Sequence, residues 1–114
     1  MWRVNGILAT SRALGDLGLK TNHIVSPEPD VRAFDLREHK PLFIILATDG
    51  LWDVFTNAEA VRFIHSHMGE TDYGAKSLAI EAHARGSLDN VSVIVVNMSN
   101  RLRADAKSEA VGQN

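Results

Sequence analysis

The chain has 114 residues, 45% of them hydrophobic and 23% charged, with a formal net charge of -2 at pH 7. These values predict one soluble globular domain with a core of modest size, and the interspersed acids and bases exclude the basic surface of a nucleic-acid binder. The absence of cysteine excludes disulfides, zinc–thiolate sites and cysteine nucleophiles, and it fits a reducing, intracellular compartment.

The first third of the chain carries few clear elements. Residues 1–6 contain no apolar signal segment and read as a start within a fold, and no run reaches the roughly 18 apolar residues that span a bilayer. Residues 26–30 predict a turn, because two prolines fix φ and remove backbone donors. Residues 31–36 then alternate apolar and polar side chains, which predicts a half-buried strand.

Two apolar runs dominate the rest of the sequence, at residues 42–47 and 91–96. Each is short and rich in β-branched or aromatic residues, which predicts strands covered on both faces. Residues 99–114 turn polar and predict a disordered tail, so residues 1–98 form the ordered part. The fold class expected from this order is α/β, with a layered sheet.

Two helices are predicted between the strands. Thr56 and Glu59 have the spacing of a capping box, in which each residue satisfies an exposed backbone donor of the other. The first helix should bury one face and end near Gly69; that face consists of Val61, Ile64 and Met68. The second should end at Gly86; its apolar positions are Ala75, Leu78, Ala79 and Ala82.

Carboxylates flank the two apolar strands. Asp49 follows the first strand, Asp53 comes four residues later, and Asp89 with Asn90 precedes the second strand. If the strands pair antiparallel, Asp49 and Asp89 meet across one strand spacing of about 5 Å. Two carboxylates that close repel each other unless a proton or a cation intervenes, and oxygen ligands suit Mg²⁺ or Mn²⁺. Asp-Gly and Asp-Asn are also ordinary turn formers, so these residues alone leave both a metal site and a capped turn open.

Four motifs narrow this choice. LATSRALGD at residues 8–16, PEPD at 27–30, LATDGLWD at 46–53 and SLDNVS at 87–92 occur in the order found in metal-dependent protein phosphatases of the PP2C (PPM) family. The resemblance covers residues 3–98. Residues 2–6 and 60–64 are most similar to the animal epsilon, or 1L, type.

The resemblance implies a β-sandwich flanked by helices on both outer faces (αββα), of which this chain holds the C-terminal part. It also implies a binuclear Mg²⁺ or Mn²⁺ centre that hydrolyses phosphoserine and phosphothreonine in proteins through a metal-bridging water. Matched onto this sequence, the family motifs make Asp49 and Asp89 metal ligands. By the same match, Asp53 supports a more weakly held metal or orients the water on that metal. Asn90 fixes the loop through hydrogen bonds of its side chain.

The departures from the family are equally specific. The family's glutamate–aspartate ligand pair, its phosphate-binding arginine and its D-G-H-G-G motif with a general-acid histidine belong to an N-terminal portion, and none is found here. The chain should therefore contain no catalytic side chain. None of its histidines is expected to take the general-acid role; they are His23, His39, His65, His67 and His83. The last three lie in predicted helices and are predicted to be surface or partly buried residues. Arg12 is interpreted as the internal partner of Asp16, and Trp52 as packing beside the site.

The leading hypothesis is thus part of a serine/threonine protein phosphatase that acts on phosphoproteins, with two metal-ligand aspartates and negligible activity alone. The missing N-terminal part or a full-length homologue is expected to complete it. A non-catalytic regulatory or binding module with part of the same fold is the alternative. A phospho-aspartyl hydrolase is disfavoured, because Leu51 stands where that class has its second aspartate.

Overall fold

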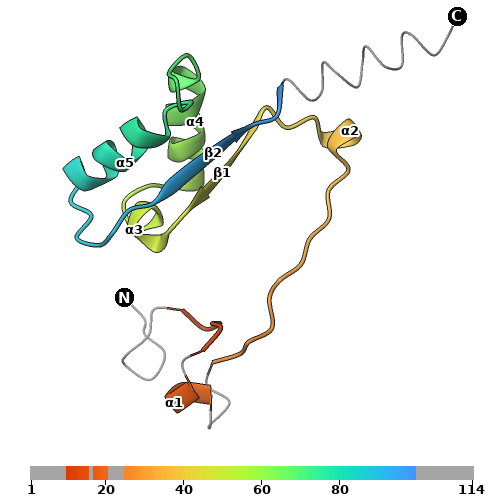
Figure 1. Ribbon diagram of the computed structural model, residues 1–114, viewed down its shortest axis with the longest axis vertical. Helices are drawn as coiled ribbons and strands as arrows, with labels where there is room; N and C mark the ends of the chain where they lie inside the picture. The colour runs from red at the N-terminus through yellow and green to blue at the C-terminus, as the bar shows by residue number, and fades with distance from the viewer. Residues whose placement is uncertain (1–9, 16, 21–24, 100–114) are drawn as a thin grey trace, which may run out of the picture. The chain divides into compact units, whose positions relative to one another are not determined.

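A computed structural model describes residues 10–15, 17–20 and 25–99, and it divides the chain into two compact units, Met1–Phe34 and Asp35–Asn114 (Figure 1). The first unit contains α1 (Leu17–Lys20) and an isolated parallel bridge between Arg12 and Ser26. Val25 is buried beside this bridge.

The described part of the second unit contains one antiparallel strand pair and four helices. In chain order these are α2 (Leu36–His39), β1 (Phe43–Ala47), α3 (Asp49–Trp52), α4 (Asn57–His67), α5 (Ala75–Ala84) and β2 (Val93–Asn97). The strand register runs from Phe43 opposite Asn97 to Ala47 opposite Val93. Both predicted apolar strands are confirmed, although β2 begins two residues later than predicted. The α/β class is confirmed as well.

The predicted helix signals act as expected. The Glu59 N–H donates to Thr56 Oγ1 over 3.3 Å, and the Thr56 N–H donates to Glu59 Oε2 over 2.8 Å, so the capping box begins α4. Gly86 has a φ of +94° and follows the last turn of α5, where its N–H donates to the His83 carbonyl. Glycine suits that left-handed position because it has no Cβ.

The core of this unit lies between the helices and one face of the strand pair. Its fully buried large side chains are Leu51, Ile64 and Leu78. The predicted inward position of Val61 is wrong: Val61 is 49% exposed, and Ala60 is buried in its place. Ala60 and Ile64 are four residues apart and define the buried stripe of α4. Ile64 is buried as predicted and Met68 packs against the same core, so the prediction fails only at Val61.

The strand predicted at residues 31–36 is also wrong. Residues 31–34, in the first unit, are exposed and have no regular structure. The second unit opens with Asp35, whose side chain accepts the Arg37 N–H over 2.8 Å and caps the single turn of α2. Alternation alone gives a segment no pairing partner, and an aspartate that bonds its own backbone favours a turn instead.

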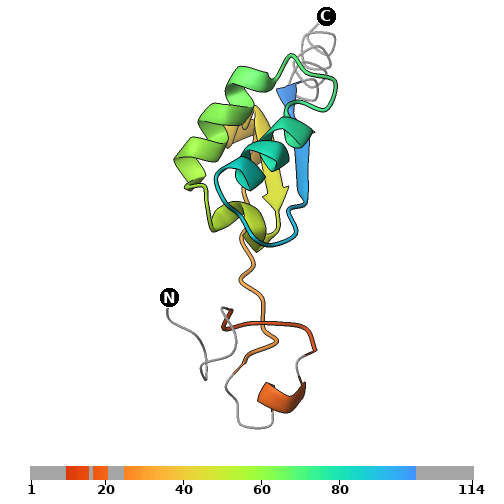
Figure 2. The same ribbon diagram turned by 90° about the vertical axis from the view of Figure 1, so that its left-hand side faces the viewer.

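Among the described residues of this unit, the strand pair is covered on one face, not on both as predicted. We call the side that packs on the helices the covered face; it consists of Phe43, Ile45, Val93 and Val95. The opposite side is the bare face, which consists of Ile44, Leu46, Ile94 and Val96. Figures 1 and 2 show α4 and α5 on the same side of the two strands.

Only Ser99 of the predicted tail 99–114 lies within the described residues. No helix in the described part of the chain has the length and apolar character needed to cross a membrane.

Candidate metal centre

Asp49 is placed at the junction of a strand and a helix. It is the first residue of α3, directly after Thr48, which ends the pairing of β1 and serves as the N-cap of that helix. Asp49 is exposed, whereas the neighbouring Gly50 and Leu51 are buried. The strand and the buried half-turn together hold the carboxylate at the end of the sheet.

Asp89 lies on the loop between α5 and β2 and is also exposed. Its Oδ1 accepts the N–H of Asn90 over 2.7 Å. The Asn90 backbone bonds on both sides: its N–H donates to Asp89 Oδ1, and its carbonyl accepts a hydrogen bond from the Thr48 hydroxyl. The predicted loop-fixing role of the Asn90 side chain stays a prediction.

The two aspartate-bearing segments adjoin. The Thr48 N–H donates to the Ser92 carbonyl over 3.1 Å, which extends the antiparallel pairing one residue beyond β1. A Cβ built on Gly50 would lie 2.5 Å from the Asn90 carbonyl oxygen. The backbones of the two loops are therefore in direct contact, as antiparallel pairing predicts, while the spacing of the two carboxylates stays a prediction.

Trp52 and Asp53 complete α3. The Trp52 indole N–H donates to the Ala47 carbonyl over 3.1 Å, so the ring is tied to the end of β1, and 36% of the residue is exposed. The Asp53 N–H donates to the Asp49 carbonyl and closes the turn, and its side chain is exposed. Trp52 is thus held beside the site by a hydrogen bond to the Ala47 carbonyl, which sequence reasoning did not predict.

The two aspartates offer the type of ligand atom that a hard divalent cation prefers, but too few ligands to fill its coordination shell. Asp49 and Asp89 offer carboxylate oxygens, which such cations prefer, whereas Mg²⁺ takes about six ligands. Within the described ranges no group of three or more histidine, cysteine, aspartate or glutamate side chains could hold a metal. These two residues can therefore supply only part of a coordination shell.

The positions of the described histidines agree with the prediction of surface or partly buried side chains. His65 and His83 are exposed, and His67 is half-buried and stacked on Phe63 with ring centroids 4.0 Å apart. His23 lies outside the described residues. His83 nevertheless lines a hollow of about 490 Å³ together with Lys76 and Asp89, a neighbourhood that the sequence analysis missed.

Arg12 has an ion-pair partner that sequence reasoning missed. Its guanidinium lies 2.6 Å from Asp30 Oδ2. This hydrogen bond and the positive charge lower the pKa of the Asp30 carboxyl below its ordinary value. Asp16, the predicted partner, lies outside the described residues, so that pair stays a prediction.

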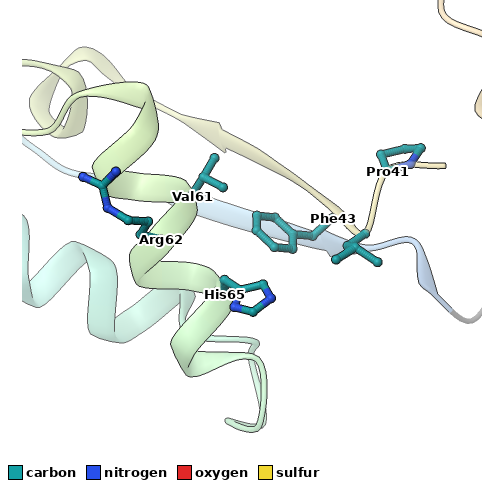
Figure 3. Close-up of a pocket in the computed structure, with 6 residues that line it drawn as sticks. Pro41, Phe43, Val61, Arg62 and His65 are labelled. Carbon is teal, nitrogen blue, oxygen red and sulfur yellow. The ribbon is translucent and has the colours of Figure 1, made fainter. Parts of the chain in front are cut away.

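A second hollow, of about 400 Å³, lies at the other end of β1 from Asp49 (Figure 3). Figure 3 shows the Phe43 ring near the α4 side chains Val61 and His65. Its walls are mainly apolar, and it lacks the carboxylates of the candidate metal centre. This hollow is therefore distinct from the candidate metal centre.

An antiparallel strand pair under a helix layer, with an acidic loop at each adjoining strand end, defines part of a layered α/β domain. The chain belongs to the Protein phosphatase 2C family, whose model matches residues 1–91. This membership confirms the resemblance seen in the four motifs.

Relatives and a solved structure agree with this assignment. Bovine Protein phosphatase 1L is 50% identical over 104 residues, which are 91% of this chain and 29% of the relative. Human Protein phosphatase 1A is 43% identical over 108 residues, covering 86% of this chain and 28% of the relative. A solved "C.elegans sex determining protein" matches 84% of this chain and 24% of its own with a TM-score of 0.65 and 28% identity. The chain thus spans less than a third of these relatives.

Proposed function

We propose that the chain forms part of the catalytic domain of a metal-dependent protein phosphatase that hydrolyses phosphoserine and phosphothreonine in proteins. Membership of the Protein phosphatase 2C family supports the class. The direct contact between the loops that carry Asp49 and Asp89 is the single structural observation that supports their common role.

In this proposal Asp49 and Asp89 hold Mg²⁺ or Mn²⁺ through their carboxylate oxygens. Such cations, when bound, lower the pKa of a coordinated water and so supply a nucleophile at neutral pH. Asp53 supports a more weakly held metal or orients its water, and the Trp52 ring limits the access of bulk water to Asp49. No side chain of this segment attacks the phosphate.

The segment alone is expected to have negligible activity. Two carboxylates cannot fill the coordination shell of a metal pair, and the sequence contains no Asp-Gly-His that could supply the family's histidine. Manganese-dependent hydrolysis of a phosphopeptide by the purified 114-residue chain, lost on Asp49→Asn, would contradict this expectation.

A chimera tests the proposal directly. We would replace the matching segment of bovine Protein phosphatase 1L by this chain, which 50% identity over 104 residues makes structurally compatible. The chimera should hydrolyse a phosphothreonine peptide with Mn²⁺, and Asp49→Asn or Asp89→Asn should each lower kcat/KM at least about 100-fold. Asp72→Asn is the matched control, because Asp72 is an exposed aspartate that accepts backbone N–H groups at the start of α5.

The outcome separates the proposal from the alternative of a non-catalytic module. A chimera that folds and binds the phosphopeptide without turnover would favour the module. Equal turnover by the chimera and by its Asp49→Asn and Asp89→Asn variants would remove both residues from the metal centre.

A further inference from the structure

We infer that Thr48 and Ser87 are positioning residues that lock the Asp49 and Asp89 loops together. Their hydroxyl contacts to Asn90, Ser92 and Gly50 are called the hydroxyl clasp. This inference rests on the proposed function, because it concerns the spacing of the two proposed metal ligands.

Thr48 provides a replacement hydrogen-bond acceptor at the end of β1, where its own backbone carbonyl is used by α3. Its carbonyl accepts the Leu51 N–H over 3.0 Å and so belongs to the first turn of α3. In a continued antiparallel ladder that carbonyl would instead accept the N–H of the opposite residue, Ser92. The Thr48 side chain replaces the Thr48 carbonyl as the acceptor: Oγ1 accepts the Ser92 N–H over 3.0 Å.

The same hydroxyl reaches the second loop. Thr48 Oγ1 donates to the Asn90 carbonyl over 3.2 Å, next to Asp89 in the chain. Thr48 makes no side-chain bond to the N-terminus of the helix that it precedes. The hydroxyl is thus used across the strand pair, and it allows the chain to turn into α3 without losing its contact with the residues before β2.

Ser87 closes the clasp from the other side. It is 4% exposed, and its Oγ donates to the Gly50 carbonyl over 2.6 Å. A buried hydroxyl needs such a partner, since an unpaired one is costly. Asp49 lies between Thr48 and Gly50, and Asp89 lies between Ser87 and Asn90, so a clasp contact flanks each aspartate on both sides.

Gly50 permits this close approach. A Cβ at position 50 would lie 2.5 Å from the Asn90 carbonyl oxygen and 3.2 Å from a Val91 side-chain carbon. Residues that orient metal ligands in this way set metal affinity, and their loss usually costs about 10- to 100-fold. The clasp is therefore expected to control metal binding by Asp49 and Asp89, and not only the stability of the fold.

The test uses Mn²⁺ as the probe and the full 114-residue chain. Backbone NMR spectra are recorded during a Mn²⁺ titration, because a paramagnetic ion broadens the amides near which it binds. In the native sequence the amides of Asp49 and Asp89 should broaden together, with the weak, roughly millimolar affinity of a site that has few ligands. Thr48→Val should weaken this binding about 10-fold and make the two broadenings unequal.

Two controls separate positioning from stability. Thr48→Ser keeps the hydroxyl and should restore the native affinity. Thr56→Val removes the capping hydroxyl of α4 and should leave Mn²⁺ binding unchanged, although it also weakens the fold. If Thr48→Val does not fold, Ser87→Ala removes the other half of the clasp and carries the same expectation.

The outcomes distinguish the two levels of the proposal. Native affinity and paired broadening in Thr48→Val, or an equal loss in Thr56→Val, would overturn the positioning role and leave the metal centre intact. Absence of broadening at both aspartates in the native sequence would overturn the clasp's control of metal binding by this chain. Chimeras with Asp49→Asn or Asp89→Asn that keep full turnover would overturn the proposed metal centre.

Discussion

The two faces of the strand pair are almost equally apolar in sequence and differ sharply in their surroundings. On the covered face, Ile45 and its neighbours pack against the cluster around Ile64 and Leu78. On the bare face, Ile44 and Leu46 are 41% and 54% exposed. Adjacent residues of one strand therefore experience an interior on one side and open surface on the other within this unit.

This difference explains which part of the sequence stabilises the unit. The helices give the covered face its packing, while the apolar residues of the bare face add little stability here. A β-sandwich, which the family resemblance implies, would place a second sheet on such a face. The contacts within the described part of this unit therefore do not explain why the bare face is apolar, whereas a second sheet packed on it would.

The largest expected effect compares two neighbouring isoleucines of β1. Ile45→Ala should lower the free energy of unfolding by about 2–3 kcal/mol, because it removes side-chain packing and leaves a cavity against the helices. Ile44→Ala is the matched control and should cost less than about 1 kcal/mol, since its side chain already contacts solvent. Urea unfolding of the full chain, followed by circular dichroism, measures both values.

Equal losses for the two variants would contradict the comparison, because they would mean that the bare face is covered in solution. A lower oligomeric state in Ile44→Ala than in the native chain, measured by light scattering, would identify a second copy as the cover.

A smaller effect is expected where the acidic loops meet. Gly50→Ala should cost about 1–3 kcal/mol, because its Cβ would lie 2.5 Å from a backbone oxygen that cannot rotate away. Gly69→Ala offers a matched control, since a Cβ there meets nothing within 4 Å. Thermal unfolding of both variants measures the contrast.

A Gly50→Ala variant as stable as Gly69→Ala would show that the two loops are not in close contact. It would also remove the steric basis of the hydroxyl clasp.

Much of the second unit could be predicted from local sequence signals. Apolar runs gave the two strands, and the spacing of Thr56 and Glu59 gave the start of α4. The strand at residues 31–36 could not be excluded locally, because alternation says nothing about a pairing partner. Which of the neighbouring α4 residues Ala60 and Val61 is buried depends on tertiary packing.

The candidate site shows the same division. The order of Asp49 and Asp89 around two strands predicted which loops adjoin, since antiparallel pairing brings the end of one strand to the start of the other. Thr48 and Ser87 were missed because their hydroxyls bond residues 42 to 44 and 37 positions away in sequence, respectively. No local pattern specifies such contacts. A threonine at a strand end and a serine in a buried loop are nevertheless sequence signals that favour hydroxyl bonds of this kind.

The smallest expected effect concerns the start of α4, which packs on the covered face. Hydrogen bonds from the Thr56 N–H and hydroxyl, and then the charge of Arg85, lower the pKa of the Glu59 carboxyl below its ordinary value. A lowered pKa in the folded state stabilises the fold above the unfolded-state pKa. This stabilisation is lost as the pH falls from the ordinary glutamate value of about 4.3 through the lowered one.

Glu59→Gln keeps a side chain that can accept the Thr56 N–H but does not titrate, so it isolates this contribution. The native chain should melt at a slightly higher temperature than Glu59→Gln near neutral pH, and the difference should shrink as the pH falls below about 4.3. Melting curves of both chains across that range measure it. A difference that stays constant would show that Glu59 keeps its ordinary pKa and that its charge adds nothing to the cap. The start of α4 would then be stabilised by the other hydrogen bonds of the cap, such as that from the Glu59 N–H to Thr56 Oγ1, and by apolar packing.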